Sequence, residues 1–302
     1  PFCGQILSEN KVKIDCATPE VMTKEISYTE EAQLDYWAFL FYPIDNPMSS
    51  QFKLFIENPA NKSIKFAFIL QFGNLVPQKY NEINNHVASL VTRINYLKIN
   101  NKPVVFIFNI NEVSLNKAWG EAKNFKRIVL DDLIAKVLKA TGTKPYFIVM
   151  DFNPETASKW ADIFELSAIS TYATHPGEKG SYKDLVKQDI NYWNRATKTG
   201  KTVIPIVMTG WDPQPRVPNP APWMNKKYLE KAKKVFFETP TPEEIAEHVR
   251  QAIKWAKENN SPAIIIYAWN EFDEGGWIMP TLYEGDKRVK AIGKVIKEEC
   301  RN

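Results

Sequence analysis

The chain has 302 residues, of which 44% are hydrophobic, 13% aromatic and 25% charged, with a net charge of +4. This composition excludes a disordered chain, and its scattered lysines argue against nucleic acid as the main partner. No apolar run approaches the ~20 residues that a membrane span needs. We therefore predict one globular domain over residues 1–302, without a membrane span.

Apolar runs of strand length alternate along the chain with stretches of helical period. Strands are expected, in order, at residues 2–7, 35–42, 65–72, 104–108, 145–152, 168–172, 203–208 and 263–269. Helices are expected at residues 19–32 (with Thr18 as the cap), 87–97, 128–138, 155–164, 182–197, 243–257 and 286–298.

Most of these strands are apolar on both faces, and the helices between them are amphipathic. Such alternation predicts a parallel sheet covered by helices. Eight units of this kind fit a closed (β/α)8 TIM barrel better than an open doubly wound sheet. We therefore predict an α/β fold, a single-domain (β/α)8 barrel in which residues 2–7 form the first strand beside residues 35–42.

A long irregular stretch, residues 211–242, follows the seventh expected strand and holds seven of the 20 prolines. Proline cannot sustain a helix interior, and loops of this length are usually functional or disordered. We predict a proline-rich loop that walls the active site and offers Trp223 as a stacking surface.

The cysteines are Cys3, Cys16 and Cys300, and no CxxC motif occurs. A zinc ribbon or a thioredoxin-like motif is therefore excluded. A hairpin that turns at Glu9-Asn10 would place Cys3 opposite Cys16. Two alternatives stay open for this pair, a disulfide or two reduced thiols.

Other motifs fail on inspection. Gly200-Lys201-Thr202 imitates the end of a phosphate loop, but Arg195 stands where the first glycine is required. The three histidines, His86, His175 and His248, are far apart in the sequence. We therefore expect no nucleotide site, no metal and no cofactor.

Barrel enzymes place their reacting groups at the C-terminal ends of the strands. Here these ends carry amides, carboxylates and aromatic rings, which suit the hydroxyls and the flat face of a sugar. A polar residue at the end of one strand is common in α/β proteins. The prediction of a carbohydrate site therefore rests on the whole set of strand ends. The expected substrate-binding residues are Tyr42, Gln71, Asn74, Tyr172, Trp211, Asp212, Arg216, Trp269, Asn270 and Trp277.

The sharpest chemical signal is the pair Glu271 and Glu274, just past the last expected strand. Paired carboxylates are the usual apparatus for glycosidic cleavage, one acting as acid and the other as base or nucleophile. Crowding of like charges raises one pKa, so one carboxyl keeps its proton near neutrality. Asp273, between them, is expected to point elsewhere. The alternative is an acidic, solvent-exposed turn.

The motif Ala268-Trp269-Asn270-Glu271-Phe272-Asp273-Glu274-Gly275, with Pro280 in register, resembles the last strand of the glycoside hydrolase family 99-like group, approximately AWNEWxEGxxxEP. This group includes endo-α-mannosidases and their WbsX-like relatives. Gly210-Trp211-Asp212 with Arg216 resembles its GWDNxxR segment, and LDYWAFLFYP its second strand. The chain departs from the group at Met279, where Glu is usual, and at Pro213, where Asn is usual.

The resemblance implies a (β/α)8 barrel without metal and retention of the anomeric configuration. It also implies that Glu271 deprotonates the sugar 2-hydroxyl, whose oxygen then attacks the anomeric carbon to give a 1,2-anhydro sugar. Glu274 would protonate the leaving oxygen and later activate water.

We therefore expect a retaining glycoside hydrolase that acts inside an oligo- or polysaccharide, α-mannoside-like by resemblance, and that is secreted, periplasmic or at the cell surface. One alternative is a non-catalytic carbohydrate-binding barrel, a module of a larger protein. Another is a polysaccharide-modifying transferase. Two crowded carboxylates favour an enzyme over a binding module, whereas fold does not separate a hydrolase from a transferase.

Overall fold

The computed structural model describes residues 1–9, 11–174, 177, 179–221 and 224–300. Asn10, His175 and Trp223, on which predictions were made, lie outside these residues. The chain forms two compact units. We call them the sheet unit (Asp35–Thr171 and Lys198–Val203) and the terminal unit (Pro1–Leu34, Tyr172–Thr197 and Ile204–Asn302).

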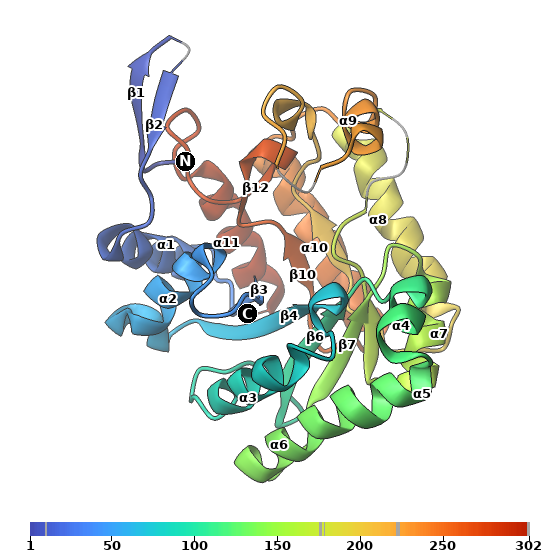
Figure 1. The fold of residues 1–302 in the computed structure, drawn as a ribbon. Coiled ribbons are helices and arrows are strands. Elements are labelled where there is room, and N and C mark those ends of the chain that lie inside the picture. The colour runs from blue at the N-terminus through green and yellow to red at the C-terminus, as the bar shows by residue number, and fades with distance from the viewer. Residues whose placement is uncertain (10, 175–176, 178, 222–223, 301–302) are drawn as a thin grey trace. The chain divides into compact units, whose positions relative to one another are not determined.

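The sheet unit is built on a parallel sheet with its strands in the order β3-β4-β6-β7-β8, of which Figure 1 labels β3, β4, β6 and β7. These strands are β3 (Tyr36–Leu40), β4 (Lys65–Gln71), β6 (Lys102–Phe108), β7 (Tyr146–Met150) and β8 (Ala168–Ser170), and β5 (Lys98–Ile99) pairs antiparallel with β6. Strands β4, β6 and β7 are buried along most of their length. Burial on both faces explains their continuous apolar sequences.

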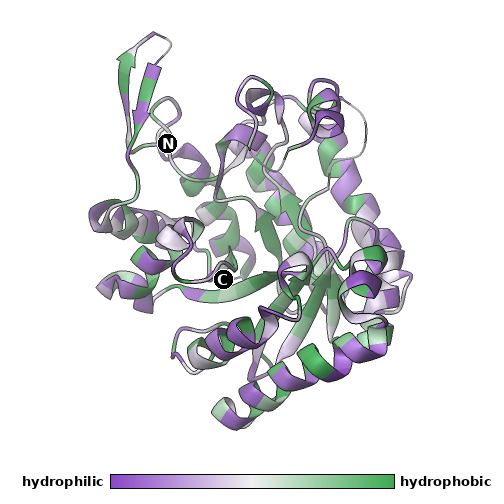
Figure 2. Ribbon diagram, viewed as in Figure 1, coloured by the Kyte–Doolittle hydropathy of each residue, from purple (hydrophilic) through white to green (hydrophobic). Residues whose placement is uncertain are grey.

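The helices of the sheet unit are amphipathic, as the mixed colours along α6 show in Figure 2. They are α2 (Ser50–Glu57), α3 (Tyr80–Leu90), α4 (Glu112–Trp119), α5 (Ala122–Phe125), α6 (Asp131–Thr141) and α7 (Pro154–Phe164), with shorter turns η1 (Pro47–Ser49), η2 (Pro59–Lys62), η3 (Phe72–Asn74) and η4 (Lys126–Leu130). Helix α3 ends earlier than expected. Val91 and Leu97, which continue its apolar period, are buried, but Ile94 between them is 94% exposed, so the predicted helical face does not continue past Val91.

Aromatic side chains fill much of the core of the sheet unit. Phe52 of α2 packs on Phe68 of β4 with ring centroids 5.0 Å apart, and Phe55 packs on Phe66 at 5.9 Å. The ring planes meet at steep angles of 64° and 73°, the edge-to-face arrangement that aromatic quadrupoles favour. A large part of the aromatic content therefore stabilises this core.

The terminal unit contains a second pair of parallel strands and most of the chain's C-terminal third. Its elements are β1 (Gly4–Ser8), β2 (Lys11–Ile14), α1 (Pro19–Glu31), α8 (Tyr182–Thr197), β9 (Ile206–Met208), η5 (Gln214–Arg216), α9 (Lys226–Ala232), α10 (Pro242–Glu258), β10 (Ile265–Tyr267), β11 (Asn270–Glu271), η6 (Phe272–Glu274), β12 (Gly276–Trp277) and α11 (Lys287–Cys300). Strands β9 and β10 are parallel, and β11 and β12 are antiparallel. Helix α10 begins at a capping box formed by Thr241 and Glu244.

The N-terminal segment differs from the prediction. Strand β1 pairs antiparallel with β2, and in the described part of the chain it joins no parallel strand. The expectation that residues 2–7 form the first barrel strand is therefore wrong. The physical reason is that most side chains of this hairpin are exposed, so the segment lacks the apolar faces that a buried parallel strand requires. Of the two alternatives for Cys3 and Cys16, the structure contains the disulfide, with Cα atoms 5.5 Å apart.

The remaining predictions on the fold are partly met. Parallel strands alternate with helices in both units, which confirms the parallel sheet covered by helices. The stretch 211–242 is not irregular throughout, because it contains η5 and α9. Helix α9 begins after the proline-rich part, where Asn225 Oδ1 caps it by accepting from the Tyr228 N–H at 2.9 Å. Among the described helices, none is long and apolar enough to cross a membrane.

Candidate active site

The two parallel strands of the terminal unit end together, and a threonine ties their ends. Thr209, just past β9, donates its backbone N–H and its hydroxyl to the Tyr267 carbonyl at 2.7 and 2.9 Å. Its Oγ1 also accepts from the Ala268 N–H at 3.2 Å. The chain is thus fixed at Tyr267, the last residue of β10, and at Ala268, three residues before Glu271.

The pair Glu271 and Glu274 lies on the tight hairpin formed by β11, η6 and β12. The hairpin requires a left-handed residue at Gly275, whose φ is 77°. A Cβ at Gly275 would lie 2.4 Å from the Asp212 nitrogen, and one at Gly210 would lie 2.1 Å from the Gly275 oxygen. Glycine at both positions therefore lets the backbone after β9 approach the hairpin, where the Asp212 N–H donates to the Glu274 carbonyl at 2.6 Å.

One guanidinium group joins the three carboxylates of this hairpin. Arg216 of η5 donates through Nη2 to Glu271 Oε2 at 3.1 Å and through Nη1 to Glu274 Oε1. Asp273 receives a bidentate pair from Nε and Nη2 at 2.7 and 3.1 Å. The side chains of Arg216 and Glu274 are only 13% and 14% exposed, so water screens their contact less than it screens a surface ion pair.

Two tyrosines also reach Glu274. The Tyr267 hydroxyl donates to Glu274 Oε2, and the Tyr228 hydroxyl of α9 donates to Oε1 at 3.4 Å. Tyr267 is almost fully buried, and burial together with the two glutamate charges raises its pKa well above the ordinary value. It therefore remains a neutral hydrogen-bond donor throughout the working pH range.

The electrostatics of the pair follow from burial and from these donors. Burial raises the pKa of Glu271 to about 7, and the charge of Glu274 adds to the rise while Arg216 opposes it. Burial also raises the pKa of Glu274, against the contacts from Tyr267 and Arg216. Because Glu274 accepts from more donors than Glu271 in the described part of the chain, a proton shared by the pair rests preferentially on Glu271.

Aromatic side chains surround this cluster. The rings of Tyr172 and Trp211 lie 5.6 and 6.1 Å from the ring of Tyr267. The guanidinium carbon of Arg288 lies 3.9 Å from the ring centroid of Trp277, the last residue of β12, which is a cation–π contact. Trp269 donates from Nε1 to the buried Glu25 Oε2 of α1 at 2.9 Å.

The structure places most of the predicted binding residues in the terminal unit, near the hairpin. Asp212 accepts from the Gln214 N–H at 3.0 Å through Oδ1, so its carboxylate shapes the turn that leads to Arg216. Asn270 is exposed and lies opposite Trp277 in the β11–β12 ladder. The residues found in this unit are Tyr172, Trp211, Asp212, Arg216, Trp269, Asn270 and Trp277.

The other three predicted binding residues belong to the sheet unit. Tyr42 follows β3, Gln71 is the last residue of β4, and Asn74 ends η3. All three are half-buried. Their part in a common site with Glu271 and Glu274 stays a prediction.

Sequence reasoning missed three side chains that contact the site. Tyr267 lies in an apolar strand and resembled a core residue, and Glu25 lies in an amphipathic helix where acidic residues are common. Tyr228 lies beyond the proline-rich segment, and no local pattern marked it. Asp273, which was expected to point elsewhere, points to Arg216. Among the described residues, no group of three or more histidine, cysteine or acidic residues is arranged to hold a metal.

Comparisons with known proteins found one matching family model and similar solved structures. The family model "Glycosyltransferase WbsX" matches residues 60–292. The structure of a GH99 endo-α-mannosidase from Bacteroides thetaiotaomicron in complex with bis-tris-propane superposes with a TM-score of 0.62 at 17% identity, covering 95% of this chain and 87% of that chain. A second structure of the GH99 endo-α-mannosidase from this organism gives a TM-score of 0.61 at 16% identity, covering 95% and 81%. These similarities show a shared fold. A search of curated proteins found no match.

Proposed function

The chain belongs to the WbsX glycosyltransferase family, and we propose that it is a retaining glycoside hydrolase that cleaves within an α-mannoside-like oligo- or polysaccharide. The observation that carries the proposal is the Glu271–Glu274 pair held by one guanidinium at the end of β10. Both carboxyl groups are partly buried, and both have raised pKa values. Such a pair near neutral pH suits acid–base cleavage of a glycosidic bond.

The proposed reaction has two steps. In the first, Glu271 takes the proton of the sugar 2-hydroxyl, O2 attacks the anomeric carbon, and Glu274 gives its proton to the departing glycosidic oxygen. In the second, water attacks the anomeric carbon, Glu274 takes a proton from that water, and O2 recovers its proton from Glu271. Both carboxyl groups return to their starting states, and the configuration is retained. These roles rest on the resemblance of the motif to the family 99-like group.

The unliganded site is not yet in the protonation state that these roles need. Arg216, Tyr267 and Tyr228 all donate to Glu274, which favours its ionised form, whereas Glu271 has the pKa of about 7. We propose that sugar hydroxyls displace part of this donor set on binding, so that Glu274 takes up the proton. If the roles are instead reversed, the dependence on the leaving group described in the Discussion reverses with them.

A second candidate is a glycosyltransferase, and the description of the family favours it. In that reaction a sugar hydroxyl replaces water as the acceptor, and the same two glutamates move the protons. The two functions therefore differ in the acceptor, and analysis of the products distinguishes a hydrolase from a transferase. A hydrolase forms free reducing ends in water, whereas a transferase forms a longer glycan and needs an added acceptor.

The test is a screen of the purified protein on α-mannans and other glycans, with and without added acceptor sugars, followed by analysis of the products. We expect the wild type to release oligosaccharides, and we expect Glu271→Gln and Glu274→Gln to bind the same glycan without releasing product. Glu243→Gln, an exposed acidic residue of α10, is the matched control and should keep full activity. Binding without turnover by the wild type would favour a binding module, and full activity in both site variants would refute the assignment of the site.

We extend the proposal to the architecture and the compartment. The parallel strands of the two units are proposed to belong to one closed (β/α)8 barrel that forms a single catalytic domain over residues 1–302, and a crystal structure with an open sheet would contradict this. The Cys3–Cys16 disulfide supports a secreted, periplasmic or cell-surface location, since disulfides persist in oxidising compartments. Detection of the protein in cytosolic fractions with both thiols reduced would contradict that location.

A further inference from the structure

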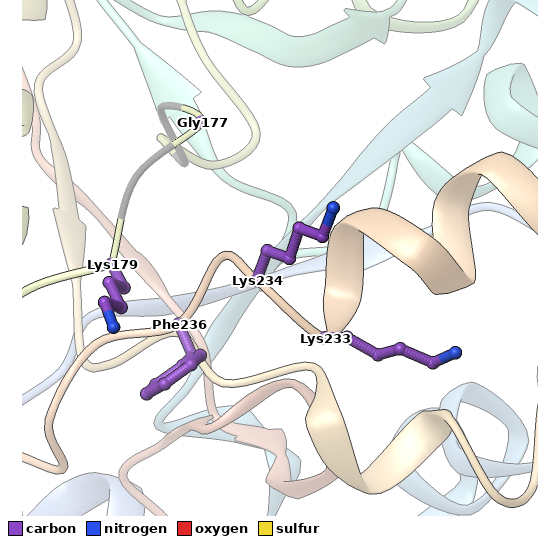
Figure 3. A pocket seen from close by; sticks show the side chains of 5 residues that line it. All are labelled: Gly177, Lys179, Lys233, Lys234 and Phe236. Atoms are coloured by element: carbon purple, nitrogen blue, oxygen red, sulfur yellow. The ribbon is translucent and has the colours of Figure 1, made fainter.

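A pocket rich in lysine lies in the terminal unit, outside the contacts of the glutamate pair. It has a volume of about 580 Å³ and is lined by Gly177, Lys179, Lys233, Lys234 and Phe236, which Figure 3 shows. We call it the lysine pocket. Among the described residues that line it, three are lysines and none is acidic.

Backbone hydrogen bonds hold the two segments that line the lysine pocket. The Gly180 N–H donates to the Phe236 carbonyl at 3.2 Å, and the Glu238 N–H donates back to the Gly180 carbonyl at 3.0 Å. Gly180 and Phe237 thereby form a parallel bridge. The bridge thus holds Phe236 beside Gly180, the residue that follows Lys179.

The three lysines are not equivalent. Lys233 is paired with Glu230, whose carboxylate oxygen lies 2.7 Å from its Nζ. Lys179 and Lys234 make no ion pair with any described residue of the chain and are exposed. In Figure 3 the three ammonium groups point in different directions. They are therefore poorly arranged to enclose one small anion, and they suit negative charges that are spread along an extended ligand.

The lysine pocket is connected to the glutamate pair through α9 and the segment that follows it. Tyr228 of α9 contacts Glu274, and Lys233 follows Tyr228 by five residues, which is about 8 Å along a helix axis at 1.5 Å per residue. The Lys233 carbonyl accepts from Gln214 Nε2 at 3.4 Å. The Phe237 N–H donates to the Trp211 carbonyl at 2.8 Å. The pocket thus lies within the reach of a glycan chain bound at Glu271 and Glu274.

We propose that the lysine pocket is a subsite for the acidic groups of an anionic polysaccharide whose bond is cleaved at Glu271 and Glu274. This deepens the proposed function and rests on it. Lys179 and Lys234 attract carboxylate or sulfate groups carried by sugars some units away from the cleaved bond, and Phe236 offers an apolar surface to a sugar ring. A neutral mannan has no charge that would engage these lysines, so the substrate class is an acid-bearing glycan.

The test measures binding to the full chain carrying Glu274→Gln, so that no probe is consumed. The probes are a mannuronate hexasaccharide, a sulfated hexasaccharide, neutral mannohexaose, inorganic phosphate and a short single-stranded oligonucleotide, each studied by calorimetry at low and at physiological salt. Adding Lys179→Glu with Lys234→Glu should weaken the binding of a charged hexasaccharide by about tenfold or more, a change readily resolved in Kd, and should leave mannohexaose unchanged. The carboxylated and sulfated probes distinguish the source of the negative charge.

The matched control is Lys254→Glu with Lys294→Glu, two exposed lysines of α10 and α11, which lowers the net charge by the same amount. It should change the binding of the charged hexasaccharides by less than about twofold at physiological salt, because charges beyond a Debye length are screened. An equal loss in both double variants would overturn the proposal in favour of general electrostatics. Full competition by phosphate would overturn it in favour of a small-anion site, and tighter binding of the oligonucleotide would overturn it in favour of nucleic acid.

The outcomes for the two proposals are distinguishable. If the wild type cleaves neutral mannan and the lysine variants bind every glycan normally, the lysine pocket proposal fails while the hydrolase proposal stands. If charged glycans bind through Lys179 and Lys234 but no glycan is cleaved, the hydrolase proposal fails while the pocket remains a binding site for acidic glycans. Lys179→Gln with Lys234→Gln, which removes the positive charges without adding negative ones, should weaken the binding of charged glycans in the same direction if lost charge causes the effect.

Discussion

The glutamate pair and Asp189, both in the terminal unit, have carboxyl pKa values that burial raises, but their surroundings differ. The glutamate pair is partly open, with Glu271 33% exposed, and a cationic guanidinium contacts both members. Asp189 of α8 is fully buried and accepts from the Met208 N–H at 2.8 Å and from the Thr174 hydroxyl. Its pKa is raised to about 8 by burial. A raised pKa alone therefore does not distinguish a reacting acid from a structural one.

The partners of Asp189 explain why its carboxyl group stays protonated and uncharged. The buried His248 has its pKa lowered to about 4 by burial, so it is neutral near pH 7. The Tyr182 hydroxyl donates to the Met208 carbonyl at 2.7 Å and lies 3.2 Å from His248 Nδ1. Nδ1 therefore carries the hydrogen, and Nε2 lies 3.4 Å from Asp189 Oδ2 without a hydrogen bond to any described residue. This cluster fastens the end of β9 without net charge, whereas the glutamate cluster keeps an excess of carboxylates beside solvent.

The largest expected effect separates the roles of the two glutamates. Glu271→Gln and Glu274→Gln should each lower kcat by ~10²–10⁴-fold on a natural glycan, the usual range for general acid–base catalysis. An activated aryl leaving group needs little protonation, so it should partly rescue Glu274→Gln and not Glu271→Gln. Steady-state kinetics on matched alkyl and aryl glycosides measures this.

A 2-deoxy substrate provides the companion experiment. It should not be cleaved by the wild type, because no 2-hydroxyl is present to attack the anomeric carbon. Efficient cleavage would show direct attack by a carboxylate, and rescue of Glu271→Gln by the aryl group would show that the two roles are reversed.

Arg216 should set the pH at which the glutamate pair works. The guanidinium lowers the pKa of Glu271 and of Glu274 from what burial alone would give, so Arg216→Gln should raise both. The acid limb of kcat/KM, expected near the Glu271 pKa of about 7, should therefore move to higher pH. A shift of one pH unit would lower the rate below that limb by about tenfold.

The control for this prediction is Arg250→Gln. Arg250 also pairs with carboxylates, those of Glu298 and Glu299 at 2.7 and 2.6 Å, and none of its ion pairs with described residues involves the hairpin. Its pH profile should match that of the wild type. An unchanged acid limb in Arg216→Gln would mean that this arginine does not control the charge of the glutamate pair.

The buried cluster around Asp189 should affect stability in a different way from the partly exposed cluster around Glu271 and Glu274. Asp189→Ala would leave the Met208 N–H and the Thr174 hydroxyl without their acceptor, at a cost of ~1–3 kcal/mol for each group. Asp189→Asn keeps an acceptor and should be milder. Denaturant unfolding of both variants measures the difference, and equal losses would show that hydrogen bonding at Asp189 is not what matters.

The pH dependence of stability gives a second measure of Asp189. Its pKa is about 8 in the folded state and ~3.9 in an unfolded chain, so the folded state binds the extra proton between these values. The stability that this proton contributes is complete below ~pH 4 and is lost as the pH rises through about 8. Asp189→Asn should remove this fall, and the surface variant Asp286→Asn should keep it. A wild type whose stability rises across this window would contradict a protonated Asp189.

The comparison also shows what the sequence was able to predict. The buried strands and amphipathic helices follow from local periodicity, so the parallel sheet was predictable, and Glu271 and Glu274 were found because they lie close together in one motif. Tyr228 reaches Glu274 across 46 residues, and Asp189 reaches Met208 across 19 residues. Such contacts depend on tertiary packing, which leaves no local pattern. The first strand was misassigned because residues 2–7 have strand propensity but pair locally in a hairpin.

The smallest expected effect on turnover concerns the Cys3–Cys16 disulfide, which lies outside both clusters. Replacing both cysteines by serine should lower Tm, since the disulfide restricts the unfolded chain; for a loop of similar length the chain-entropy estimate is ~3 kcal/mol. Turnover should change little, because the N-terminal segment reaches the motif only indirectly. The Phe2 N–H donates to the Pro280 carbonyl at 2.7 Å, and the nearby Met279 N–H donates to the Trp269 carbonyl at 2.9 Å. Cys300→Ser, at the exposed free thiol, is the control. A loss of kcat at unchanged Tm in the double variant would show that this indirect connection positions Glu271. The β1–β2 hairpin would then support the glutamate pair.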